Sequence, residues 1–211
     1  MAPPRVIATT IQCVRTRIAV SSLLALAAAA SALTAGGAGA ATHTTATVYE
    51  AFSYHGVIVP HVRVASGYCW TTSNVTRRDD AWRCFVGNVI YDPCFSSTFT
   101  TGVVVCPTPW NDQGTEIHLT KPLPARTGAD VIPSLSLAPW AIQTASGANC
   151  TFASGATSVI HGKRLNYFCG ASAKYGLWGF PNRSGQPWTI LSAPFTAKVL
   201  SGRVAIRHAW M

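Results

Sequence analysis

Carboxylates are scarce in this sequence of 211 residues, which has only seven Asp and Glu side chains. Glycoside hydrolysis requires two facing carboxylates, and the best placed pair is Asp80 with Asp92. A structural role is favoured for both. Asp92 precedes a proline, as turn-forming residues do, and Asp80 is close enough in sequence to pair with Arg83. The sequence therefore assigns no catalytic residue.

Short motifs that mark metal, phosphate and hydrolase sites are also absent. The chain has neither Cys-x-x-Cys nor His-x-His, which disfavours zinc, and it has no glycine-rich phosphate loop. It lacks the Gly-x-Ser-x-Gly nucleophile elbow, although a Ser-His-Asp triad stays open because its members meet only in the fold. His208 falls on an apolar face, where a core role is commoner than a ligand role. We expect no cofactor and no metal.

Cysteine and tryptophan are abundant in one stretch. Residues 68–110 hold four cysteines and three tryptophans. Outside the first forty residues the chain has six cysteines, an even number that indicates disulfides in an exported protein. The simplest pairing joins sequence neighbours: Cys69–Cys84, Cys94–Cys106 and Cys150–Cys169. Each such bond constrains the unfolded chain by about 3 kcal/mol.

Residues 1–40 have the form of a secretory signal. Three arginines precede an uncharged Ala/Leu-rich run, Ile18 to Ala35, and Ala38-Gly39-Ala40 has the small-x-small form of a signal-peptidase site. An uncleaved anchor is the alternative, since 18 residues reach the lower limit for spanning a membrane. The alanine content of the run favours cleavage. We expect a secreted or cell-wall-associated product without membrane contact after cleavage.

The remaining sequence has the pattern of β-strands, without helical periodicity of useful length. Trp82–Val86 and Val89–Tyr91 flank Gly87-Asn88 as in a hairpin, and Glu116–Thr120 alternates apolar and polar residues. A proline-rich passage, Lys121–Arg126, separates two β-rich halves. We predict an all-β, disulfide-stapled fold, as one domain or two small lobes, after a signal helix. The predicted divisions are residues 1–40 (signal peptide), 41–126 (N-terminal β lobe, two disulfides) and 127–211 (C-terminal β lobe, one disulfide).

Several motifs together resemble a group of uncharacterised secreted proteins of actinobacteria. They are Cys69-Trp70-Thr71-Thr72-Ser73, Asp80 to Cys84, Gly87 to Phe95, Cys150 to Ala156, Asn166 to Cys169, and Ala209-Trp210. The resemblance covers nearly all of the chain after residue 40. It implies a secreted, envelope-associated protein, and it implies no activity and no catalytic residue.

Positive charge is concentrated in the C-terminal half. After residue 40 the chain has 13 Lys and Arg against 7 Asp and Glu, a net charge of +6, and no acidic residue follows Trp140. Arg203 to Trp210 is predicted as the second strand of a hairpin with Ala197 to Leu200. Its alternation places Arg203 and Arg207 on one face, opposite an apolar stripe. Such a surface attracts polyanions, and plain solubility is the alternative reading.

Aromatic residues are the other candidates for ligand contact, because they dominate binding hot spots. Trp110 stands in a predicted proline-rich loop and is expected to be exposed, whereas Trp82 and Trp210 are expected to be structural. With Trp110, Arg203 and Arg207 as candidate ligand contacts, the sequence favours a secreted, non-enzymatic, envelope-associated binding or interaction protein. Its partner would be an anionic cell-wall polymer or another secreted protein, without specific nucleic-acid binding.

Two other functions stay open at this point. One is a secreted hydrolase that acts on a wall polymer or peptide. The other is a secreted protease inhibitor, for which Cys106 to Pro109 would supply a stiff loop beside a disulfide.

The signal prediction is tested at the N-terminus of secreted material. Because Ala38-Gly39-Ala40 fits a signal-peptidase site, N-terminal sequencing should give Ala41 or Thr42 as the first residue. An intact product retained in the membrane fraction would instead identify Ile18 to Ala35 as an anchor.

Overall fold

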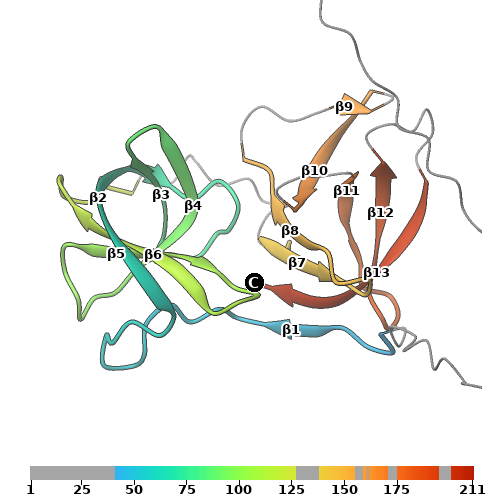
Figure 1. Cartoon of the computed structure of the whole chain (residues 1–211), viewed down its shortest axis with the longest axis horizontal. Coiled ribbons are helices and arrows are strands. Elements are labelled where there is room, and N and C mark those ends of the chain that lie inside the picture. Colours follow the sequence, from blue (N-terminus) through green and yellow to red (C-terminus); the bar gives the residue numbers. More distant parts are fainter. Residues whose placement is uncertain (1–40, 127–137, 155–158, 161, 171–174, 195–200) are drawn as a thin grey trace, which may run out of the picture. The chain divides into compact units, whose positions relative to one another are not determined.

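A computed structural model describes residues 41–126, 138–154, 159–160, 162–170, 175–194 and 201–211 (Figure 1). These ranges fold into strands without an α-helix, and they contain no helix long and apolar enough to cross a membrane. The all-β prediction is confirmed. The predicted signal, residues 1–40, and the predicted strand Ala197 to Leu200 lie outside the described residues.

Five strands form a closed N-terminal barrel. They are β2 (His61–Thr72), β3 (Ala81–Val86), β4 (Val89–Ser96), β5 (Val103–Thr108) and β6 (Gln113–Leu119). Successive strands pair antiparallel, and a parallel pairing of β2 with β6 closes the barrel. Gly87 has a φ of 57° in the β3–β4 turn, a left-handed conformation that glycine adopts without steric cost. The predicted hairpin is therefore present.

A second set of strands forms the C-terminal barrel. They are β7 (Ala141–Thr144), β8 (Asn149–Phe152), β10 (Lys163–Cys169), β11 (Tyr175–Asn182), β12 (Thr189–Pro194) and β13 (Ser201–Trp210). A pairing of β13 with β7 closes this barrel, and the short β9 (Val159–Ile160) pairs with β10. The described antiparallel hairpin partner of β13 is β12.

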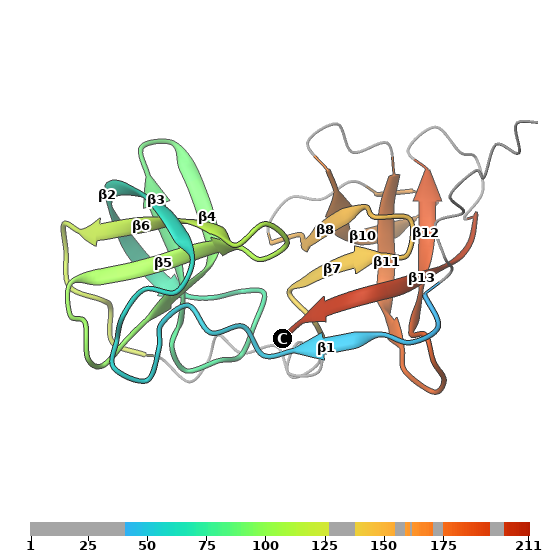
Figure 2. The same cartoon turned by 60° about the horizontal axis from the view of Figure 1, so that its bottom comes forward.

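One strand leaves sequence order. Strand β1 (Thr45–Thr47) precedes the N-terminal barrel but pairs in parallel with β13, Thr45 opposite His208 and Thr47 opposite Trp210 (Figure 2). The sheet of the C-terminal barrel thus includes residues from the start of the described chain. The lobe limits suggested by the sequence, residues 41–126 and 127–211, remain predictions.

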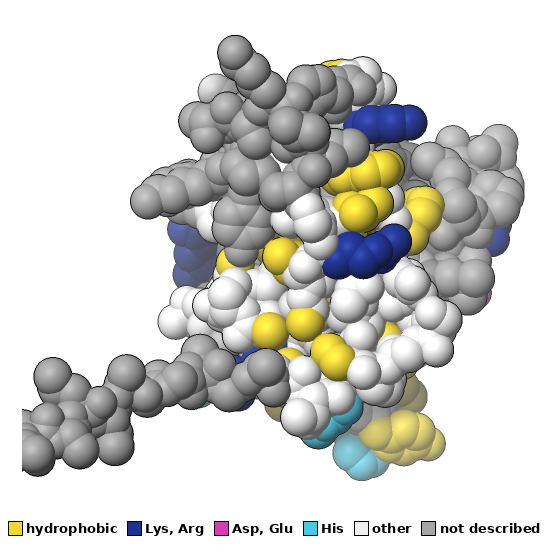
Figure 3. Space-filling model, turned by 90° about the vertical axis from the view of Figure 1, so that its right-hand side faces the viewer, with side chains coloured by type: hydrophobic (Ala, Val, Ile, Leu, Met, Phe, Trp, Pro, Cys, Tyr) yellow, Lys and Arg dark blue, Asp and Glu magenta, His cyan; other side chains and the backbone are white. Residues whose placement is uncertain are grey.

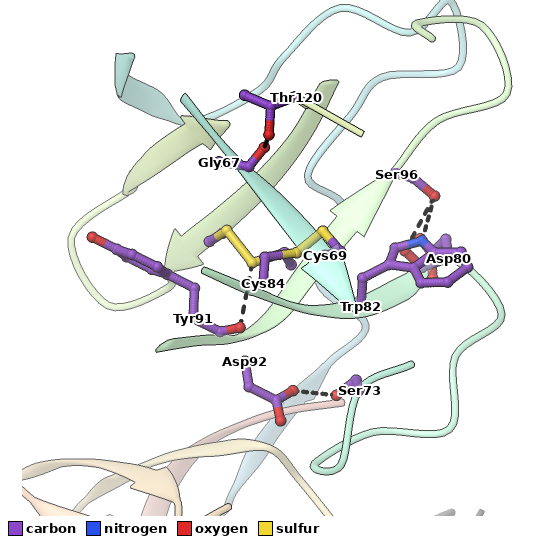
Figure 4. The surroundings of a disulfide bond; sticks show 12 residues. Gly67, Cys69, Ser73, Asp80, Trp82, Cys84, Tyr91, Asp92, Ser96 and Thr120 are labelled. Carbon is purple, nitrogen blue, oxygen red and sulfur yellow. Dashed lines mark hydrogen bonds between the residues drawn. A yellow bond between two sulfur atoms is a disulfide. The ribbon is translucent and has the colours of Figure 1, made fainter. Parts of the chain in front are cut away.

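The three disulfides pair the cysteines as the sequence predicts, each between neighbouring strands. Cys69 and Cys84 are opposite each other on β2 and β3 (Figure 4), and Cys150 and Cys169 are opposite each other on β8 and β10. The third, Cys94–Cys106, joins β4 to β5. Each bond lies within a single barrel, so these bonds stabilise the barrels individually.

Each barrel has its own buried core. In the N-terminal barrel the cystines pack with Trp82, Val104 and Ile117, and the indole Nε1 of Trp82 donates to Ser96 Oγ at 2.9 Å. The core of the C-terminal barrel includes Tyr167, whose hydroxyl donates to the carbonyl of Pro139 at 2.7 Å. The structural roles predicted for Trp82 and Trp210 are confirmed, since both side chains are buried.

A further apolar cluster draws on both barrels and on the segment before β2, and is called here the inter-barrel cluster. Its buried members are Tyr49, Ala51, Phe52, Val75, Ala81, Phe95, Val105, Trp140, Ala141 and Trp210. The ring of Tyr49 stacks on Phe95 at 6.2 Å and meets Trp140 edge-on at 5.8 Å. Aromatic pairs in these geometries add about 0.5–1.5 kcal/mol to the effect of burial alone.

Replacing Trp140 tests how much this cluster contributes to the stability of the protein. We expect Trp140→Ala to lower the free energy of unfolding by about 3–5 kcal/mol, because it removes a buried side chain and leaves a cavity. Urea denaturation measures the loss. The matched control is Trp70→Ala, whose side chain is 36% exposed and whose loss should be much smaller. Equal losses in the two variants would contradict the importance of the cluster.

Candidate functional site

Arg203 and Arg207 lie exposed on β13, as the alternation of this strand predicts. Between them the neighbouring Ile206 is buried. On an extended strand the two arginines are about 13 Å apart. Arg203 Nη1 also donates to Thr189 Oγ1 on β12 at 3.3 Å, which holds this guanidinium along the outer surface of the sheet.

Five Lys and Arg side chains of the C-terminal barrel are described, and each belongs to an exposed residue. They are Lys163, Arg164, Arg183, Arg203 and Arg207. Lys174 and Lys198 lie outside the described residues. On the side of this barrel seen in Figure 3, Lys and Arg side chains lie beside hydrophobic ones. No Asp or Glu follows Trp140, so the strands of this barrel, β7 to β13, carry basic residues and no acidic ones.

Aromatic rings take the place of acidic partners for two of these cations. The guanidinium of Arg183 lies 4.5 Å from the ring centroid of Trp188, and the ammonium of Lys163 lies 6.0 Å from that of Trp178. Cation–π contacts hold a cation while leaving its charge unneutralised. Partial burial lowers the pKa of Arg183. Sequence reasoning missed both pairs. Lys163 and Trp178 lie on different strands, and Arg183 and Trp188 lie in the loop between β11 and β12, where no strand or helix periodicity predicts a contact.

In the N-terminal barrel region, unlike the C-terminal barrel, acidic and basic residues balance. Residues 41–126 contain six Lys and Arg and six Asp and Glu, and several of them pair. Arg78 binds Asp80 at 2.6 Å. The prediction that Asp80 pairs with Arg83 is wrong, because Arg78 reaches both carboxylate oxygens while Arg83 lies 3.8 Å from Asp92. Positive potential is therefore not expected to build up over this barrel.

Asp92 is a buried carboxylate inside β4, and not the turn residue that its proline neighbour suggested. Its side chain is 2% exposed. Ser73 Oγ donates to one oxygen at 2.5 Å (Figure 4), and the backbone N–H of Asn74 donates to the other at 3.1 Å. Burial raises the pKa of Asp92 to about 6, against the opposing effect of these hydrogen bonds and of Arg83.

This buried group also touches the C-terminal barrel. The guanidinium of Arg83 donates to the carbonyl of Ser154 at 3.4 Å, and a hydrogen bond with the Ser154 side chain lowers the pKa of Asp92. Asp80 and Asp92 are therefore held by different arginines. This arrangement gives no support to a glycosidase pair, and it suits a structural link between the barrels.

Trp110 is half-buried, so the expectation that it is exposed is wrong. Its ring packs against the inter-barrel cluster and meets Trp210 at 6.3 Å. The proline-rich sequence correctly predicted a turn after β5. In this turn the side chain of Trp110 packs against Trp210 and does not point into solvent. Whether Trp110 contacts a ligand stays a prediction.

His208 is a packed residue of β13. Its Nε2 lies 2.9 Å from Thr47 Oγ1 on β1, and its ring stacks on Trp210 at 4.2 Å. Burial, with the nearby charge of Arg207, lowers the pKa of His208. Among the described residues, no group of three or more His, Cys, Asp or Glu side chains is arranged to hold a metal ion.

The raised pKa of Asp92 predicts a pH dependence of stability. Its ordinary value is 3.8 and its value in the folded protein is about 6, so the folded state holds this proton more tightly. The stabilisation is complete below about pH 4 and is lost as the pH rises through 6. Relative to Asp92→Asn, which does not ionise, the wild-type protein should lose on the order of 2–3 kcal/mol between pH 4 and pH 8.

Urea unfolding of both proteins across this range measures the difference. Asp79→Asn is the control, because Asp79 is fully exposed and its removal should leave the slope with pH unchanged. Parallel profiles for wild type and Asp92→Asn would show that the folded and unfolded pKa values of Asp92 are equal.

Comparison with known proteins gives no match to a family model, a curated protein or a solved structure.

Proposed function

We propose that the protein is a secreted, non-enzymatic binding protein of a cell envelope, and that its C-terminal barrel binds an anionic envelope polymer. The observation that carries this proposal is the set of five exposed cations, Lys163, Arg164, Arg183, Arg203 and Arg207, on a half of the chain without Asp or Glu after Trp140.

The electrostatics of this barrel favour a polymer over a small anion. Exposed charges are screened over about 8 Å at physiological ionic strength, and Arg203 and Arg207 are about 13 Å apart along β13. A single small anion therefore interacts strongly with only one of them. A chain of repeated negative charges contacts several cations at once, and its weak contacts combine into useful avidity.

The disulfides support the location outside the cytoplasm. Three of them are present, and such bonds persist in oxidising compartments. The other functions considered gain less support. For a hydrolase, the candidate acids Asp80 and Asp92 are each paired with an arginine. For a protease inhibitor, most of the segment Cys106 to Pro109 belongs to strand β5, which ends at Thr108, and not to a loop.

A charge-matched pair of variants tests the cationic surface. We expect Arg203→Gln with Arg207→Gln to weaken binding to heparin and to lipoteichoic acid roughly tenfold at about 20 mM salt, because counterion release scales with the number of contacts. The control, Arg77→Gln with Lys121→Gln, removes the same charge from exposed residues of the N-terminal barrel region and should change affinity little.

Both double variants should keep the wild-type melting temperature, since exposed positions contribute little to stability. Wild-type affinity should fall steeply between about 20 mM and about 200 mM salt. Binding that ignores salt, or that the control weakens as much as the β13 variant, would refute the assignment to the C-terminal barrel. The protein should bind heparin and lipoteichoic acid without cleaving either polymer.

A further inference from the structure

Two adjoining hollows lie at one end of the N-terminal barrel, where β3 and β5 begin and β4 and β6 end. Their volumes are about 730 Å³ and about 540 Å³, within the range of small-molecule sites. They share one wall, made of Asp80, Ser96, Ser97 and Thr98. Together they are called here the barrel-end groove.

Two exposed aromatic rings border this groove. Tyr54 is 83% exposed and Phe99 is 66% exposed, both line the smaller hollow, and their ring centroids are 6.1 Å apart. The ring of His55 lies 5.2 Å from that of Tyr54. Burial of such rings in a core would be favourable, so their joint exposure beside a hollow indicates a contact surface.

The loops that carry these rings are fixed to each other. Thr100 Oγ1 donates to the carbonyl of Gly56 at 2.6 Å, and the backbone of Ser53 bonds to Gly56 and Val57 within one tight turn. Gly56 has a φ of 77°, and a Cβ there would stand 2.6 Å from Phe99 Cβ. Because the loops are held in place before any ligand arrives, binding loses less conformational entropy.

Polar groups line the rest of the groove. Thr98 and Thr101 belong to this lining, and their hydroxyl groups make no hydrogen bond with other described residues. Asp79 also borders the groove; its carboxylate is fully exposed and meets Arg126 through one oxygen at 3.3 Å. The two hydroxyl groups can donate hydrogen bonds to a ligand or accept them from it, and the carboxylate of Asp79 can accept them.

We propose that the barrel-end groove binds a neutral oligosaccharide. A pyranose ring has C–H faces that pack on the rings of Tyr54 and Phe99, and its hydroxyls pair with Thr98, Thr101 and Asp79. An anionic ligand fits less well, because Asp79 and Asp80 outnumber the basic Lys121 in the lining of the larger hollow. An extended peptide would add to a free strand edge, and the closed barrel has none among its described strands.

This site is separate from the cationic surface of the C-terminal barrel, so either proposal can fail without the other. Titration of the purified protein with tetramers of N-acetylglucosamine, glucose and mannose tests it. Two-dimensional NMR spectra should show shifts at Tyr54, Phe99 and Thr101 for at least one tetramer. The dissociation constant should be nearly the same at about 20 mM and about 500 mM salt, because neutral sugars release no counterions.

Variants locate the binding. Tyr54→Ala with Phe99→Ala should weaken the tetramer roughly tenfold or more, as expected for the loss of two stacking faces. Thr101→Val, which keeps the shape of the side chain, should weaken it by a factor of about three through one lost hydrogen bond. The matched control is Phe180→Ala, an aromatic residue of the C-terminal barrel that is 45% exposed, and its affinity should equal that of the wild type.

The proposal is overturned if all three tetramers leave the groove signals unchanged at about 10 mM, a concentration far above the dissociation constant of an ordinary binding site. It is also overturned if binding maps to the C-terminal barrel, or if Thr101→Val and the aromatic double variant bind as the wild type does. Unchanged urea midpoints of the variants would exclude unfolding as the cause of any loss.

Discussion

The packing of Trp140 against Tyr49 and Phe95 is the contact on which the arrangement of the chain most depends. Each disulfide lies within one barrel, so no covalent bond beyond the backbone joins the described strands of one barrel to those of the other. Their association relies on the inter-barrel cluster and on the buried polar contact of Asp92, Arg83 and Ser154. Strand β1 reinforces it, because pairing with β13 fixes the segment that carries Tyr49.

The two barrels present different chemistry on this shared frame. Around the N-terminal barrel, acids and bases are equal in number and several are paired, so its surface offers shape, aromatic rings and hydroxyl groups. The C-terminal barrel offers exposed cations on a stretch of sequence that has no acidic residue after Trp140. Under the two proposals above, the ligand is a polymer that combines neutral sugars with anionic groups, and each surface binds one component. The combination of two weak sites would raise avidity without a tight site on either barrel.

Local features of the fold could be read from the sequence, and distant pairings could not. The β3–β4 hairpin, the nearest-neighbour disulfides and the exposure of Arg203 and Arg207 all follow from patterns within a few residues. The parallel pairing of β1 with β13 joins residues more than 160 positions apart, and no hydrophobic periodicity in the sequence predicts this pairing. Trp110 was misjudged for the same reason, because the ring it meets belongs to the distant Trp210. Asp80 was misjudged for a different reason: Arg78 and Arg83 are both near it in sequence, and only the fold shows that Arg78 is its partner.

The groove was equally invisible in sequence, since serine, threonine and one phenylalanine in a loop are unremarkable there. It exists because antiparallel pairing brings the loops next to β3, β4, β5 and β6 to one end of the barrel. The Cys94–Cys106 bond encloses the loop that carries Ser97, Thr98 and Phe99. A staple at this position limits the conformations of the loop in the unfolded chain, and it also ties the flanks of the loop together in the folded one. Stability and preorganisation of a binding surface then arise from the same covalent bond.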